Sequence, residues 1–201
     1  MKEPTAEDIV EYWFRDEATG RMDLPQSKRW FQGGSKLDRE LAERFGSTLA
    51  LARAGSLDHW RESPTGTLAL IILLDQFNRN INRGTAEAFA GDAQALSLCH
   101  HAIDRNYPAG WPLTHQVFCY MPLEHDESVS SQERSVALFT ELLEKAPPEL
   151  QSYAKGTLDY ALQHKEIIDR FGRYPYRNAV LEREDTAEER EWLADGKRFG
   201  Q

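Results

Sequence analysis

The stretch that decides the fold is residues 64–80, PTGTLALIILLDQFNRN. Pro64 suits the first turn of a helix, where a missing N–H costs nothing. From Leu68 to Leu74 every residue is apolar, so a helix here is hydrophobic on all faces and belongs in the centre of the protein. A short apolar run can also form a buried strand. The helical patterns on both sides favour the helix.

Helical signals surround this stretch. Toward the N-terminus, Thr5 and Asp8 have the spacing of a capping box, and residues 35–52 carry an apolar stripe with helical spacing. Toward the C-terminus, Thr85 is predicted to cap a helix that runs through Ile103.

The C-terminal half has its own helix starts and stops. We expect Pro122 to end a helix that begins near Trp111. Ser128 or Ser130 is predicted to open the next helix, and Ser130 and Glu133 are predicted to form a second capping box. A further helix is predicted after Pro147-Pro148, with an apolar face from Tyr153 to Phe171, and a last one from about Thr186 to Ala194.

No segment alternates between apolar and polar residues for long enough to form a sheet, and no long linker divides the chain. We therefore predict an all-α fold in a single domain, residues 1–201. The pattern indicates a compact bundle of helical hairpins with about eight to ten helices.

Composition narrows the classes of function. The net charge of −9 repels phosphate backbones, so we expect no nucleic-acid partner. The longest apolar run, Leu68–Leu74, is far shorter than the ~20 residues of a membrane span, and residues 1–8 lack the apolar core of a signal peptide. Cys99 and Cys119 are expected to be buried thiols in a reducing compartment. We expect a cytoplasmic protein with no membrane association.

Polar residues follow the apolar run directly, from Asp75 to Asn80. Asp75 and Arg79 are four residues apart, as are Gln76 and Asn80, so each pair shares a helical face. A carboxylate in apolar surroundings needs a cation beside it. An ion pair with amide caps at a helix end explains this pattern, and the wall of a pocket is the functional alternative.

A second polar segment is YMPLEHDE, residues 120–127, followed by Gln132. His125 is expected in a loop beside three carboxylates, one of them Glu127. Three interpretations stay open: metal ligation, a carboxylate-held general acid or base, and helix-cap electrostatics. The spacing matches no defined metal motif. Gln132 lies on an apolar stripe and should have a buried partner.

A third polar segment begins at His164, which lies on an apolar helical stripe and is itself explained as a satisfied core residue. Residues 170–178 contain three arginines and no acid: Arg170, Arg173 and Arg177. Guanidinium groups among aromatic rings suit a carboxylate or a phosphate. The alternative is that they neutralise carboxylates such as Asp75 in one buried network.

Two of these segments resemble each other. FNRN, residues 77–80, and YPYRN, residues 174–178, both place an aromatic residue shortly before Arg-Asn. This similarity indicates either two similar helix ends that meet at one site or a coincidence.

The three segments, in full, resemble a bacterial family known as domain of unknown function 924. The motifs are LLDQFNRNINRGTAEAFAGDAQAL (73–96), FCYMPLEHDESVSSQ (118–132) and HKEIIDRFGRYPYRN (164–178). The resemblance extends from about Ile9 to Glu189. It implies an all-α, tetratricopeptide-like fold and no activity.

The chain departs from the family pattern at four positions. Asn78 stands where proline is usual, Asn82 where an aromatic residue is, and Glu124 where methionine is common. Tyr176 stands where histidine is usual, which weakens any proposal that a second histidine completes a metal site here.

Three hypotheses for function follow, and all expect the polar segments to meet in one cleft. The first is a binding module for an anionic small molecule or a peptide carboxylate. Its candidate ligand-binding residues are Asp75, Gln76, Arg79, Asn80, Gln132, Arg170, Arg173, Arg177 and Asn178. No metal and no cofactor are expected, and the sequence does not indicate an oligomeric state.

The second hypothesis is a hydrolase-type enzyme with His125 or His164 as general acid or base, oriented by Glu127 or Asp75. No serine or cysteine has the setting of a covalent nucleophile. The third hypothesis is a buried ion network with a purely structural role.

Overall fold

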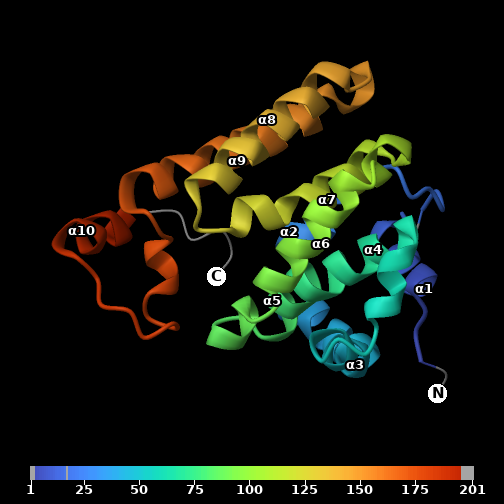
Figure 1. Ribbon diagram of the computed structural model, residues 1–201, viewed down its shortest axis with the longest axis horizontal. Coiled ribbons are helices and arrows are strands. Elements are labelled where there is room, and N and C mark those ends of the chain that lie inside the picture. Colours follow the sequence, from blue (N-terminus) through green and yellow to red (C-terminus); the bar gives the residue numbers. More distant parts are fainter. Residues whose placement is uncertain (1–2, 17, 196–201) are drawn as a thin grey trace.

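All the regular secondary structure in the described residues is helical. The computed structural model describes residues 3–16 and 18–195, and these ranges contain no strand (Figure 1). Its α-helices are α1 (Ala6–Phe14), α2 (Ser27–Gln32), α3 (Gly34–Arg53), α4 (Pro64–Ile71), α5 (Asn78–Ile81), α6 (Asp92–Asp104), α7 (Leu113–His125), α8 (Val129–Lys145), α9 (Gln151–Phe171) and α10 (Ala187–Asp195). The predicted all-α fold is confirmed.

The apolar run forms the predicted central helix. A π-helical turn, Ile72–Phe77, joins α4 to α5 so that the chain stays helical from Pro64 to Ile81. Residues 68–74 are each at most 2% exposed. Large rings from two other helices pack against this rod: Trp13 of α1 lies 5.3 Å from the ring of Phe77 and 5.7 Å from that of Phe118 in α7. Burial of these rings is a major source of stability.

The helix ends follow the sequence signals in part. Thr5 and Asp8 form the predicted capping box. Of the two predicted starts of the next helix, Ser128 is confirmed, because it is the N-cap of α8, which begins at Val129. The predicted box at Ser130 is wrong, because Ser130 lies inside the first turn. The helix predicted from Thr85 is wrong as well: a short 3-10 turn, Ala86–Phe89, comes first and α6 begins only at Asp92.

Pro122 does not end a helix, in contrast to the prediction. It lies inside α7, which continues to His125. The carbonyls at the end of this helix find side-chain donors instead: the Nε2 of Gln132 donates to the oxygens of Leu123 and Glu124 at 3.2 and 2.8 Å. The hydroxyl of Tyr174 also donates to the Glu124 oxygen. These tertiary contacts let the last turn form despite the proline.

The C-terminal half packs on the rest of the molecule as a long hairpin of α8 and α9, with α10 at one end of it (Figure 1). One hydrophobic core extends from Ala6 to Ala161, and a smaller cluster surrounds Ile168 and Tyr174. The single-domain organisation and the tetratricopeptide-like arrangement of hairpins stay predictions.

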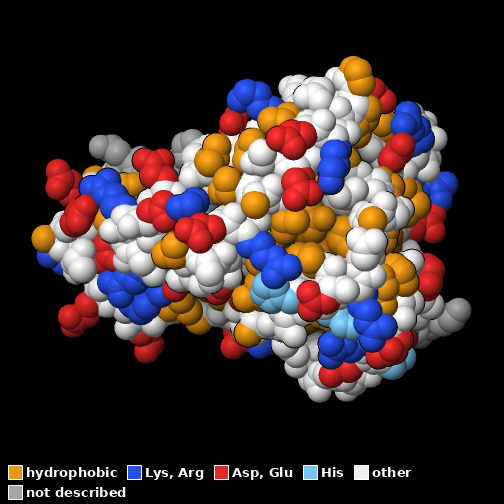
Figure 2. Space-filling view, turned by 45° about the horizontal axis from the view of Figure 1, so that its top comes forward, with side chains coloured by type: hydrophobic (Ala, Val, Ile, Leu, Met, Phe, Trp, Pro, Cys, Tyr) orange, Lys and Arg blue, Asp and Glu red, His pale blue; other side chains and the backbone are white. Residues whose placement is uncertain are grey.

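The surface mixes charges of both signs. Figure 2 shows basic and acidic side chains intermingled around a central group of hydrophobic ones on one face. Several of these charged side chains form ion pairs between residues i and i+4 of the same helix, such as Lys155 with Asp159 at 2.7 Å. None of the described helices combines the length and apolarity that crossing a bilayer demands.

Candidate functional site

A cavity of about 740 Å³ opens between the N-terminal helices and the α9 hairpin arm, a size typical of small-molecule pockets. Its lining changes character along two helices. On α7 the lining passes from Val117 and Met121 to His125, and on α9 from Tyr153 to His164. The two imidazole rings lie 6.1 Å apart, so the polar ends of both walls meet. The cavity therefore has an apolar part and a polar part.

The centre of the polar part is a histidine–aspartate pair. The Nδ1 of His125 lies 2.6 Å from the Oδ1 of Asp75, which is fully buried. Burial by itself raises the pKa of Asp75, but the charges of Arg79 and His125 and the hydrogen bond from Gln76 hold it well below its usual value. An ionised carboxylate only accepts hydrogen bonds. The proton of neutral His125 is therefore on Nδ1, and a lone pair is on Nε2.

His125 is neutral because of its surroundings. Burial and the nearby guanidinium of Arg79 lower its pKa, and the charges of Asp75 and Asp92 only partly offset this. Since His125 lines the cavity and Asp75 holds Nδ1, the basic nitrogen left for a bound molecule is Nε2.

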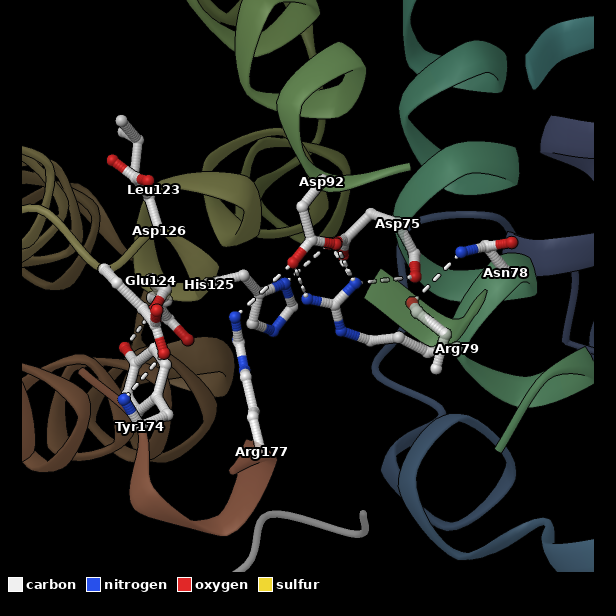
Figure 3. Close-up of polar contacts among 12 residues, drawn as sticks. Asp75, Asn78, Arg79, Asp92, Leu123, Glu124, His125, Asp126, Tyr174 and Arg177 are labelled. Atoms are coloured by element: carbon white, nitrogen blue, oxygen red, sulfur yellow. Dashed lines mark hydrogen bonds and ion pairs between the residues drawn. The ribbon is translucent and has the colours of Figure 1, made fainter. Parts of the chain in front are cut away.

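Two arginines meet at one carboxylate beside this pair. Arg79 donates two hydrogen bonds to Asp92, at 2.6 and 2.9 Å, and lies 3.1 Å from Asp75. Arg177 approaches the other side of Asp92 at 3.6 Å (Figure 3). The sequence echo between residues 77–80 and 174–178 thus corresponds to two Arg-Asn pairs whose arginines converge on Asp92.

Arg177 is the less satisfied of these two cations. Its distance to Asp92 exceeds that of a hydrogen bond, and its buried Nε has no hydrogen-bond partner among the described residues. Its guanidinium lies 4.7 Å from the ring centre of Phe89 and 4.5 Å from that of Tyr174. These rings hold the cation in place while leaving hydrogen-bonding capacity toward the cavity, which Arg177 lines.

Glu124 is a buried acid on the cavity wall, only 4% exposed. The Nδ1 of His164 is 3.8 Å from its carboxylate oxygen and bonds instead to the carbonyl of Tyr160 at 2.9 Å. Burial, with the charge of Asp75, raises the pKa of Glu124 well above its usual value. Burial lowers the pKa of His164 to about 3. Burial therefore favours the uncharged form of both side chains.

A C-terminal segment brings Tyr176 and Arg177 to the cavity. The turn Pro175–Arg177 follows α9, whose end is marked by Gly172 in the left-handed conformation. Arg183 anchors the segment on Glu127 with bonds of 2.7 and 3.0 Å, and Glu127 also accepts from the backbone N–H of Tyr174 at 2.7 Å.

The structure gathers part of the predicted site. Asp75 lies directly behind His125, and six further predicted residues line the cavity: Gln76, Arg79, Asn80, His125, His164 and Arg177. Asn80 lies near the rim, where it accepts a hydrogen bond from Arg83 at 2.7 Å. The sequence predicted His125 in a loop, and this prediction is wrong, because His125 is the last residue of α7.

Five predicted residues lie outside the cavity, and these expectations need correction. Arg170 and Arg173 pair with Glu188 and Glu189 of α10, at 2.8 and 2.6 Å. Asn178 donates to Asp185 at 2.7 Å. The reason is that α10, which follows residues 170–178 closely, supplies the acids this segment lacks.

Glu127 and Gln132 have other roles. Glu127 binds Arg183, so Asp75 and not Glu127 orients His125. Gln132 is fully buried, as its place on an apolar stripe predicted, and its partners are the carbonyls at the end of α7 and the hydroxyl of Tyr174 at 3.0 Å.

Sequence patterns missed Asp92 and the apolar half of the cavity. Asp92 is the first residue of α6, where an acid is common simply because it suits the helix dipole. Trp30 and Phe31 of α2 line the cavity but look like ordinary core residues in sequence.

No three His, Cys, Asp or Glu side chains are arranged to hold a metal ion within residues 3–16 and 18–195.

The comparisons with known proteins agree with this architecture but assign no activity. The family model described as "Bacterial protein of unknown function (DUF924)" matches residues 9–197. A solved structure of a protein of unknown function from Agrobacterium tumefaciens is 34% identical, with a TM-score of 0.79 over 95% of this chain and 97% of that one. No curated protein sequence matches the chain.

Proposed function

Because the chain belongs to the DUF924 family of bacterial proteins of unknown function, we propose from the cavity alone that it binds the carboxylate of a small molecule with an apolar body. The observation that carries this proposal is Arg177. It is 5% exposed, lines the cavity, and has a buried Nε without a partner among the described residues. A guanidinium of this kind suits a carboxylate oxygen.

The apolar part of the cavity lining indicates the chemistry of the rest of the ligand. Arg79 is already occupied by Asp75 and Asp92, and Arg83 by Asp38. Of the arginines in the described lining, Arg177 is therefore the one available for an anionic group. Beyond it, Val117, Met121 and Trp30 offer apolar surface. A short aliphatic or aromatic body fits this surface better than a second charge.

Titration calorimetry and thermal shift with hexanoate test the proposal. Hexanoate is expected to raise the Tm, and butyrate, which lacks two methylene groups, is expected to bind about fifteenfold more weakly. Hexanol, which has no carboxylate, is expected to bind weakly. Arg177→Gln should abolish the preference for hexanoate over hexanol.

The matched control is Arg173→Gln, since Arg173 pairs with Glu189 outside the cavity. This variant should bind hexanoate like the wild type. The proposal fails when hexanoate does not bind the wild type, or when Arg177→Gln binds it equally well. Failure of binding together with unfolding of Asp75→Asn would favour the purely structural ion network.

A further inference from the structure

Two neighbouring residues at the end of α7 present opposite proton-transfer abilities to the same cavity. His125 has its Nδ1 proton held by Asp75 at 2.6 Å and keeps a basic Nε2. Among the described residues, Glu124 has no cation within hydrogen-bond distance, since its ion-pair contact is with His164 at 3.8 Å. A buried carboxyl group without a cation keeps its proton. Both residues line the cavity.

Such a pair is the requirement for concerted acid–base catalysis. A neutral imidazole accepts a proton, and a neutral carboxyl group donates one. Where the surroundings shift the pKa values of two titratable groups in opposite directions, the two groups can serve as the base and the acid. The third requirement, a cation where negative charge develops, is met by Arg177, which lines the cavity and lies 3.6 Å from Asp92.

We propose that the cavity is the active site of a hydrolase for esters or amides of apolar carboxylic acids, with His125 as general base and Glu124 as general acid. This inference rests on the proposed function, because the carboxylate that Arg177 would bind is the acid product of the reaction.

The reaction balances without a cofactor. The Nε2 of His125 takes one proton from water while the water oxygen bonds to the carbonyl carbon, and the carbonyl π pair moves onto its oxygen. Arg177 stabilises this oxyanion. When the oxyanion pair re-forms the carbonyl, the bond from carbon to the leaving oxygen or nitrogen breaks, and Glu124 gives its proton to the leaving group.

The protonation states are then restored within the site. The proton on His125 returns to the Glu124 carboxylate through water in the cavity that both residues line. The sum is one water consumed, and one carboxylic acid and one alcohol or amine formed. The apolar wall at Val117 and Met121 would hold the acyl chain of the substrate.

The test compares two substrates of one acyl group: p-nitrophenyl hexanoate and hexanoic acid 4-nitroanilide. Nitrophenolate leaves without a proton, whereas an anilide nitrogen requires one. His125→Gln is expected to reduce kcat about 100-fold or more on both substrates. Glu124→Gln is expected to reduce kcat by a similar factor on the anilide and to leave the ester nearly unchanged. A structural defect would not separate the substrates in this way.

The control variant is His101→Gln, a partly buried histidine whose Nδ1 lies 3.2 Å from Arg61, away from the cavity. It should hydrolyse both substrates like the wild type. Wild-type protein that binds hexanoate but hydrolyses neither substrate above the protein-free rate overturns this inference and leaves the proposed function standing. So does hydrolysis that survives His125→Gln. Absence of hexanoate binding overturns the proposed function itself.

Discussion

At the scale of single residues, the site depends on which partner each charged group finds. Asp75 accepts a hydrogen bond from the Nδ1 of His125 and pairs with the Nη1 of Arg79. Asp92 pairs with both Nη1 and Nη2 of Arg79. The pairing of Asp75 with Arg79 was predictable, because four residues of helix bring them together. The pairings with His125 and Asp92 were not, since they join residues 50 and 13 positions apart.

Asp75→Asn is predicted to disable the base while leaving it in place. Without the carboxylate, neither the tautomer nor the orientation of His125 is fixed, so kcat on p-nitrophenyl hexanoate should fall about 100-fold or more. Loss of one partner from a buried ion network should also cost about 3–5 kcal/mol of unfolding free energy, measured by urea denaturation.

The pH profile separates this positioning role from a merely structural one. The charges that act on His125 are Arg79, which lowers its pKa, and Asp75 and Asp92, which raise it, while His164 faces it across the cavity. Removal of the Asp75 charge lowers the pKa of His125 further, so the acid limb of kcat/KM should move to lower pH. An unmoved limb would contradict the assignment of His125 as the base.

At the scale of elements, helix identity was predictable and helix ends were not. The apolar run and the Thr5 capping box depend on local spacing, which the chain carries in itself. The continuation of α7 past Pro122 depends on Gln132 and Tyr174, which arrive from distant elements. The π-helical turn Ile72–Phe77 had no sequence signal, yet it carries Asp75 and Gln76 to the site, as such turns often do.

Gly91→Ala is predicted to disturb the contact between α6 and this turn. A Cβ at Gly91 would lie 2.2 Å from the backbone oxygen of Leu74, so the start of α6, with Asp92, must shift. We expect a loss of about 2–4 kcal/mol of unfolding free energy and weaker hexanoate binding. Gly46→Ala is the control, because nothing lies within 4 Å of its Cβ position; this change inside α3 should stabilise by about 0.5–1 kcal/mol. Equal stability of the two variants would contradict the close approach.

At the scale of the whole molecule, buried histidines make stability depend on pH. Burial lowers the pKa of His115 to about 4 and that of His164 to about 3, whereas both titrate near 6.5 in the unfolded chain. At pH values between the folded and unfolded pKa values, the unfolded chain binds more protons than the folded one. Stability therefore falls as the pH falls from about 6.5, by at most about 1.4 kcal/mol per pH unit for each histidine.

His164→Gln is predicted to reduce this acid sensitivity. Urea unfolding at pH 7, 6, 5 and 4 should show a shallower loss of stability for the variant than for the wild type. The exposed His59 serves as the control, and His59→Gln should keep the wild-type slope. A wild-type slope in His164→Gln would show that His164 is not buried in its neutral form.

The sequence by itself determined the all-α class, the central helix and the three polar segments, because these follow from the spacing of apolar residues and from contacts within one helix. It also indicated which segment carries the arginine that lines the cavity, but not which of three arginines it is. Only the tertiary structure decided that Arg173 turns to Glu189 while Arg177 turns to Asp92. It likewise decided that Glu124 is buried without a cation beside His125. The physical reason is that ion pairing and desolvation depend on distances in space, and residues far apart along the chain set those distances.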